Sequence, residues 1–187
     1  MMIGIRMLLL MTLLTGFVYP LVINGLAQLM FPAKANGSRI IDNGRVMGSE
    51  LIGQQFDDPK QFWSRLSATG PFPYNAASSS GSNYGLGNPD LKKALEARRS
   101  ALLAADPGNT QPIPADLLTA SASGLDPHIS PESALYQADR VARLRGLPSD
   151  KVRSLVAQHT ESRQLGFFGE PVVNVVLLNR ALNGLQK

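Results

Sequence analysis

The sequence of 187 residues contains no cysteine and only two histidines. Without cysteine, the chain can form no disulfides, no thiol nucleophile and no cysteine metal site. His128 and His159 form no ligand cluster at a recognisable spacing, so the sequence predicts no metal site. Charged residues are also few, at 17% with a net charge of +4, and the basic ones are scattered. Nucleic-acid-binding surfaces cluster their basic residues, so we expect no nucleic-acid partner.

Charge is absent altogether from residues 7–33. A bilayer core is crossed by a helix of about 20 mostly apolar residues. We therefore predict an N-terminal tail at 1–6, an uncleaved transmembrane anchor helix at 7–33 within the lipid bilayer, and a single domain at 34–187. A secretory signal peptide cleaved near Ala33 is one alternative, although its apolar region would span only ~7–15 residues. A buried helix of a soluble protein is the other, and the length of the run argues against it.

Several polar or helix-disturbing residues lie inside the predicted span. Pro20 leaves the carbonyl of Gly16 without its helical donor, which predicts a kink there. Free carbonyls and amide side chains are costly against lipid and tolerated against protein. We therefore predict that this helix packs against other membrane helices; a lipid-facing anchor that tolerates the polar residues is the alternative. The predicted contact residues are Gly16, Tyr19, Pro20, Asn24 and Gln28.

The charges that flank the span bear on its orientation. Lys34, Arg39 and Arg45 on the C-terminal side outnumber Arg6 on the other side. The positive-inside rule then favours a cytoplasmic location for the following domain, but the rule weakens when that domain is long. The flanks alone therefore favour an inside domain only weakly.

The remainder of the chain has the patterns of an α+β domain. Asp42-Asn43-Gly44 predicts the tight turn of a hairpin. Asn88 and Ser130 are predicted helix N-caps, and Gly146 a C-terminal stop. The predicted helices are 89–105, 131–145 and 148–158, with a short helical turn at 114–118. The run 170–179 is predicted to be a buried strand, and the chain is predicted to turn helical from Leu178 to Asn183. The fold class is therefore an α+β soluble domain with one N-terminal transmembrane helix.

Two loops attract functional interpretations. Residues 68–87 are rich in Pro, Gly and Ser, but their aromatic residues favour an ordered, partner-facing loop over a flexible linker. Residues 119–130 contain Ser121, Ser123, Asp126 and His128, the residue types of a hydrolytic triad. Triad members usually come from distant points of a chain, and the Gly-x-Ser-x-Gly motif is absent. We interpret these residues as turn and cap residues, with a membrane-anchored serine hydrolase as the alternative.

Two further patterns bear on function. The sequence has no Gly-x-x-x-x-Gly-Lys-Ser/Thr phosphate loop, so it gives no strong signal for nucleotide binding. Arg140, Arg143 and Arg145 are predicted to form the solvated face of a helix. The residues by themselves thus indicate a membrane-anchored α+β domain without evident catalysis.

Several motifs resemble those of one family. They are "TGFVYPLV", "GSELIGQQF", "PYNAASSSGSN", "LTASASGLDPHISP" and "GEPVVNVVLLN". The sequence resembles, nearly end to end, the C subunits of the Kdp potassium-transporting P-type ATPases of bacteria. It departs from the family pattern at Leu66, where Pro is usual, and at Ser80, where Gly is usual.

The resemblance implies a non-catalytic subunit of an ATP-driven, high-affinity potassium import complex. The implied partners are a channel-like K+-selective subunit, the catalytic P-type ATPase subunit and a small membrane subunit. No cofactor is expected on this chain; ATP, Mg2+ and K+ would act at the level of the complex. The subunit would stabilise the assembly and shape ion access.

The resemblance also implies a location and an alternative role. The chain would be a single-pass protein of the bacterial cytoplasmic (inner) membrane with its domain outside, contrary to the weak preference of the flanking charges. The family has also been described as assisting ATP binding by the catalytic subunit, although an outside domain could not touch cytoplasmic ATP. The residues implied as family-signature or interface residues are Gln54, Pro73, Tyr74, Asn75, Gly81, Ser82, Asn83, Ser121, Ser123, Gly124, Leu125 and Asp126.

Overall fold

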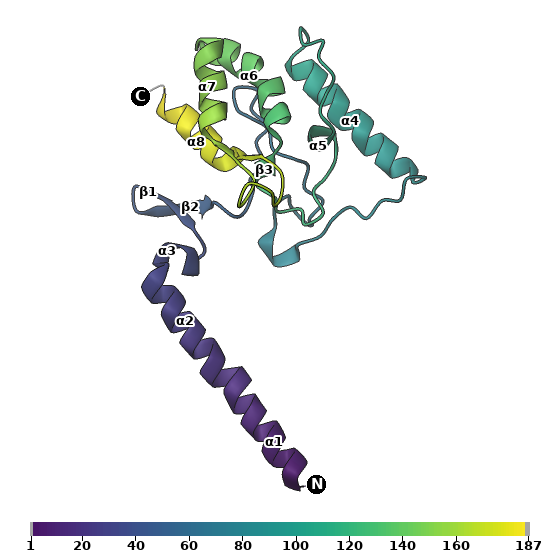
Figure 1. The fold of residues 1–187 in the computed structure, drawn as a ribbon. Helices are drawn as coiled ribbons and strands as arrows, with labels where there is room; N and C mark the ends of the chain where they lie inside the picture. Colours follow the sequence, from purple (N-terminus) through teal and green to yellow (C-terminus); the bar gives the residue numbers. More distant parts are fainter. Residues whose placement is uncertain (1, 186–187) are drawn as a thin grey trace. The chain divides into compact units, whose positions relative to one another are not determined.

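The structure, a computed structural model, describes residues 2–185 (Figure 1). The chain divides into two compact units, one up to Ser49 and one from Glu50 onward. Helices and small sheets occur together, and one N-terminal helix is long and apolar enough to cross a membrane. The predicted fold class, an α+β domain with one N-terminal transmembrane helix, is confirmed.

The first unit begins with one continuous apolar helix of 29 residues, Met2–Met30. It consists of α1 (Met2–Leu13), a π-helical turn η1 (Leu14–Val18) and α2 (Tyr19–Met30). In the π turn, the backbone N–H of Tyr19 donates to the carbonyl of Leu14, five residues back. The π turn ends at Val18, two residues before Pro20, whose missing N–H was expected to disturb the helix.

A short helix and a hairpin complete the first unit. They are α3 (Pro32–Ala35), β1 (Arg39–Asp42) and β2 (Arg45–Ser49), with the two strands antiparallel. The turn residues Asn43 and Gly44 have φ angles of 48° and 77°. Both lie in the left-handed region that a tight two-residue turn requires, so the predicted hairpin is confirmed.

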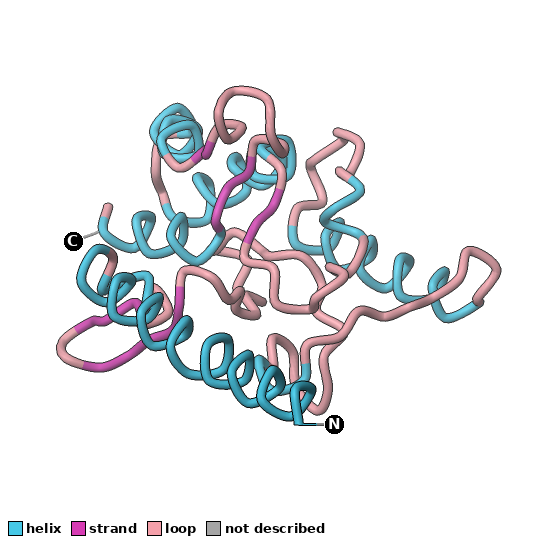
Figure 2. Tube along the Cα trace, turned by 60° about the horizontal axis from the view of Figure 1, so that its bottom comes forward, coloured by secondary structure: helices cyan, strands magenta, loops and turns pink. Residues whose placement is uncertain are grey.

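The core of the second unit is a small antiparallel sheet covered by helices (Figure 2). The sheet has the order β3 (His128–Ile129), β5 (Val172–Asn174) and β4 (Thr160–Glu161). Around it lie α6 (Pro131–Arg145), α7 (Ser149–Gln158) and α8 (Val175–Gly184). The fully buried core side chains include Phe62, Leu117, Ile129, Val141, Val152, Val156, Val173, Leu178 and Leu182.

Capping residues fix the predicted helices. The Ser130 hydroxyl accepts from the N–H of Ser133 at 3.1 Å, and Asn88 caps α4 (Pro89–Ala105) by accepting from Asp90 at 2.8 Å. Gly146 ends α6 in the left-handed conformation. The remaining helical segments are η2 (Ala76–Ser78) and α5 (Ala115–Leu118).

The predicted strand at 170–179 is wrong over most of its length. The strand β5 covers only Val172–Asn174, and α8 starts at Val175. The Asn174 side chain accepts hydrogen bonds from the N–H groups of Val176 and Leu177 at 3.1 and 3.2 Å. This N-cap begins a helix inside a run whose β-branched residues had suggested a strand.

Candidate functional site

The two loops singled out in the sequence lie against each other. Leu66 pairs with Ala120 in a parallel bridge, and the N–H of Ser121 donates to the carbonyl of Leu66 at 3.0 Å. Further along, the N–H of Ser80 donates to the carbonyl of Ser123 at 3.0 Å. We call residues 66–86 and 119–126 together the double loop. It contains all of the family-signature residues except Gln54, which lies beside it and whose carbonyl accepts from the Ser64 hydroxyl.

Two glycines allow the loops to approach so closely. A Cβ at Gly81 would lie 2.7 Å from the carbonyl oxygen of Ala122, closer than real Cβ contacts come. Gly124 has a φ of +68°, and a Cβ there would lie 2.6 Å from the carbonyl oxygen of Ser80. Each glycine faces backbone of the opposite loop, which cannot move aside without separating the loops. Glycine is therefore required at both positions.

Hydroxyl groups hold the first loop in its conformation, and one of them also bonds to the second loop. The Ser67 hydroxyl donates to the carbonyl of Gly124 at 2.7 Å and accepts from the N–H of Tyr74 at 2.9 Å. The Thr69 hydroxyl donates to the carbonyl of Phe72 at 2.8 Å and accepts from the N–H of Asn75 at 3.0 Å. The segment is therefore an ordered loop rather than a flexible linker.

Tyr74 anchors the first loop to the rest of the unit. Its hydroxyl donates to the carbonyl of Arg65 at 2.6 Å, and burial raises the pKa of this phenol. Beside it lies a cavity of about 80 Å³ lined by Ser64, Arg98 and neighbouring residues. Small-molecule pockets usually measure ~300–1,000 Å³, so this cavity is too small to enclose a nucleotide.

Asp126 connects the second loop to Arg65 and His128. One carboxylate oxygen lies 3.2 Å from the Arg65 guanidinium, and the other accepts from the N–H of His128 at 3.0 Å. The Nδ1 atom of His128 is 3.3 Å from the same oxygen. Burial alone would raise the pKa of Asp126, but the hydrogen bonds from His128 and the charge of Arg65 outweigh it and lower this pKa.

The candidate triad is not assembled. The buried Ser121 hydroxyl accepts from the N–H of Gly124 at 2.9 Å, and the Ser123 hydroxyl accepts from the N–H of Leu125 at 3.1 Å. Within residues 2–185, no hydrogen bond joins His128 to either serine. Both hydroxyls close local turns, as the turn interpretation predicts, and the geometry gives the hydrolase alternative no nucleophile–base pair.

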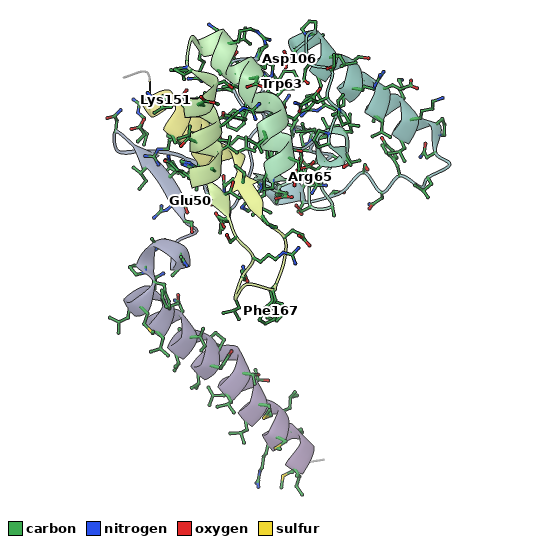
Figure 3. All side chains as sticks on the ribbon, turned by 45° about the horizontal axis from the view of Figure 1, so that its top comes forward. Glu50, Trp63, Arg65, Asp106, Lys151 and Phe167 are labelled. Carbon is green, nitrogen blue, oxygen red and sulfur yellow. The ribbon has the colours of Figure 1, made fainter. Side chains whose placement is uncertain are left out.

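The segment that leads into the double loop was not among the residues predicted from the sequence. Two guanidinium groups lie over the ring of Trp63, which is labelled in Figure 3: the Cζ atoms of Arg98 and Arg140 are 5.1 and 5.0 Å from its ring centre. Arg98 also donates to the carbonyls of Leu117 and Ser64 at 2.9 and 2.7 Å. Arginine faces on an aromatic ring stabilise by cation–π attraction. A lone tryptophan in a chain with scattered arginines gave no sequence signal of this contact.

The predicted solvated arginine face is wrong for Arg140, which is 2% exposed. Its guanidinium donates to the carbonyls of Pro59 and Gln61 and to the side chain of Gln137. Burial lowers the pKa of Arg140 to about 10. The other two arginines of the predicted face, Arg143 and Arg145, also bond within the unit, to Asp106 at 2.7 Å and to the carbonyl of Lys60 at 2.6 Å respectively.

The predicted membrane-contact residues lie along the long helix. Gly16, Tyr19, Pro20, Asn24 and Gln28 are all exposed. Of these, Gln28 has a local role, because its amide oxygen accepts from the Asn36 side chain at 3.0 Å. All five remain predicted contacts with partner helices.

Residues 2–185 bring no three His, Cys, Asp or Glu side chains together as a metal site would require.

Comparison with known proteins identifies relatives over almost the whole chain. The model of the family described as "K+-transporting ATPase, c chain" (KdpC) matches residues 1–184. A protein of Polaromonas naphthalenivorans, named potassium-transporting ATPase KdpC subunit, is 61% identical over 176 residues, which cover 94% of this chain and 90% of the relative. Proteins of the same name from Methylococcus capsulatus and Dechloromonas aromatica are 59% and 58% identical, each over 98% of this chain and 96% of the relative.

Proposed function

The chain belongs to the KdpC family of K+-transporting ATPase subunits, and from this premise we propose that it is a non-catalytic subunit whose double loop binds another subunit. A subunit of this ATPase takes part in potassium transport together with other Kdp subunits. The chain stabilises the assembly through a protein-binding surface and supplies none of the reacting groups.

The use of the signature residues carries this proposal. Gly81 and Gly124 serve close packing of backbone on backbone, and Ser121 and Ser123 close turns. These residues build a shaped surface and no reactive centre. The end of the first loop presents large apolar side chains to solvent: Tyr84 is exposed, and Leu86 is 99% exposed. Tyrosine is enriched among the residues that dominate protein interfaces, and the exposed leucine beside it adds apolar surface that a partner would remove from water.

The spanning helix provides the second contact. Asn24 is an amide in the middle of an apolar helix, and its hydrogen-bonding groups are best satisfied by a neighbouring helix. We propose that Gly16 and Asn24 face membrane helices of the complex. The partners are the channel-like K+-selective subunit, the catalytic P-type subunit and the small membrane subunit, and ATP, Mg2+ and K+ bind at the level of that complex.

Co-purification tests the interface. The chain would be expressed together with its partner subunits, one of which carries an affinity tag. The Tyr84→Ala/Leu86→Glu variant would be compared with Lys151→Glu, a control change at an exposed position of α7. The double-loop variant is expected to be lost from the purified complex and the control retained. Full retention and normal potassium uptake with the double-loop variant would contradict the proposal.

The side of the membrane is a separate part of the proposal. We propose that the second unit lies outside the inner membrane, close to the ion entrance of the channel-like subunit. Because the chain has no cysteine, a Ser79→Cys variant carries a single thiol on an exposed loop. Labelling of intact cells by a membrane-impermeant maleimide is expected. Labelling only after lysis would place the unit inside and make an accessory role in ATP binding the better hypothesis.

A further inference from the structure

The loop between β4 and β5 carries the most concentrated apolar surface of the second unit. Leu165, Phe167 and Phe168 are 82%, 64% and 56% exposed. The two phenylalanine rings pack on each other with their centres 4.2 Å apart. Figure 3 shows Phe167 at the end of this loop, where it projects from the unit.

The loop is a closed turn with its own hydrogen bonds. Gln164 and Phe168 exchange both backbone hydrogen bonds at 2.9 Å, and an ion pair joins Arg163 to Glu170 at the base. Leu165 and Gly166 take left-handed φ angles of 52° and 82°, which reverse the chain between the paired residues. The backbone is thus folded so that apolar side chains lie at the tip and charged ones at the base.

This order of side chains suits the boundary of a bilayer. Apolar residues at a tip can enter the acyl region while charged residues at the base remain among headgroups. Backbone groups without a hydrogen-bond partner are costly to bury in lipid. In this loop the backbone groups of Gln164 and Phe168 bond to each other. The tip is also convex, and a fluid bilayer adapts to a protrusion for which a protein partner would need a matching hollow.

The covalent chain keeps the second unit near the membrane. Arg39 at the start of the hairpin pairs with Ser49 at its end, so the chain enters and leaves the hairpin at nearly the same point. Residues 31–38 are then the effective tether between the spanning helix and Glu50. At about 3.5 Å per residue, these eight residues reach at most ~28 Å when fully extended.

We propose that Leu165, Phe167 and Phe168 insert into the interfacial region of the lipid bilayer, as a second membrane contact of the chain. The contact holds the second unit against the membrane surface. It rests on the spanning helix and not on the binding of the double loop to a partner, so the two proposals can fail separately.

Lipid quenching tests the insertion directly. In the full chain, Phe167→Cys would be labelled with an environment-sensitive fluorophore and the protein placed in lipid nanodiscs without other subunits. Lys151→Cys is the control, because Lys151 lies at the end of α7 away from the loop. Leu165→Cys is a second probe that keeps both phenylalanine rings.

The proposal predicts blue-shifted emission at positions 165 and 167 and loss of that emission with brominated lipids, with no loss at position 151. An apolar face at the interface lies about 5–10 Å into the headgroup and acyl boundary, so bromines near the headgroup should quench more than bromines near the chain ends. Emission at 165 and 167 that brominated lipids leave unchanged would overturn it. Emission that shifts to the blue only after the other Kdp subunits are added to the nanodiscs, and that brominated lipid leaves unchanged, would also overturn it, in favour of a protein partner.

Discussion

The side-chain amide of Asn179 makes both backbone hydrogen bonds of Phe62. Its nitrogen donates to the carbonyl of Phe62 at 2.9 Å, and its oxygen accepts from the N–H of the same residue at 2.9 Å. Gln137 binds both backbone groups of Trp63 in the same way, at 3.2 and 2.8 Å. The segment that leads into the double loop is thus held by amide side chains from α8 and α6, as a neighbouring strand would hold it.

Replacement of Asn179 should loosen this segment. Asn179→Leu keeps the approximate volume but leaves two buried backbone groups unpaired, which costs about 1–3 kcal/mol for each group. We expect a clearly lower midpoint in a denaturant or thermal unfolding experiment. Asn183→Leu, on the exposed end of the same helix, removes only an exposed hydrogen bond from Arg145 and should lower the free energy of unfolding by no more than about 1 kcal/mol. Equal effects of the two substitutions would contradict the assigned role.

The close approach of the two loops depends on Gly81. The added Cβ of Gly81→Ala would press on the carbonyl of Ala122 and should destabilise the protein by about 1–3 kcal/mol, as overpacking does. The loop should also be cut faster by a protease. Gly85→Ala is the matched control, because a Cβ there meets nothing within 4 Å. If Gly81→Ala resists proteolysis as well as the control does, the loops do not pack as described.

The ionised Asp126 should make stability depend on pH at the acid end. Hydrogen bonds from His128 and the charge of Arg65 lower the pKa of Asp126 in the folded state below its ordinary value of 3.8. The unfolded state then binds the proton first, so this stabilisation is complete well above pH 3.8 and is lost as the pH falls through the folded-state pKa. The stability difference between wild type and Asp126→Asn should therefore shrink on acidification in urea titrations. A difference that stays constant across that range would show that the carboxylate is not stabilised.

Local signals in the sequence predicted much of the fold. Helix ends were predicted from single residues: the side chains of Asn88 and Ser130 cap helix N-termini, and Gly146 ends a helix because glycine readily takes a left-handed φ. The structure places all three at helix ends. The span and the Asn43–Gly44 turn are equally local, since each depends only on adjacent residues.

Features that depend on distant partners were not predictable in this way. Arg140 lies on a helix with other arginines, and nothing nearby in sequence shows that it binds the carbonyls of Pro59 and Gln61. The β-branched residues that follow Asn174 looked like a continuation of the strand, although Asn174 ends β5 and caps α8. The resemblance identified the signature loops; their mutual packing through Gly81 and Gly124 came from the structure.

Site-specific photo-crosslinking at Leu86 tests the central claim most directly. A photoreactive amino acid would replace Leu86 in one sample and Lys151 in another, each co-expressed with the other Kdp subunits, and membranes would be irradiated before purification. The account predicts a covalent adduct between the chain and another Kdp subunit from position 86, and none from position 151. An assembled, active complex without any adduct from position 86 would contradict the claim that the surface of the double loop binds a partner subunit.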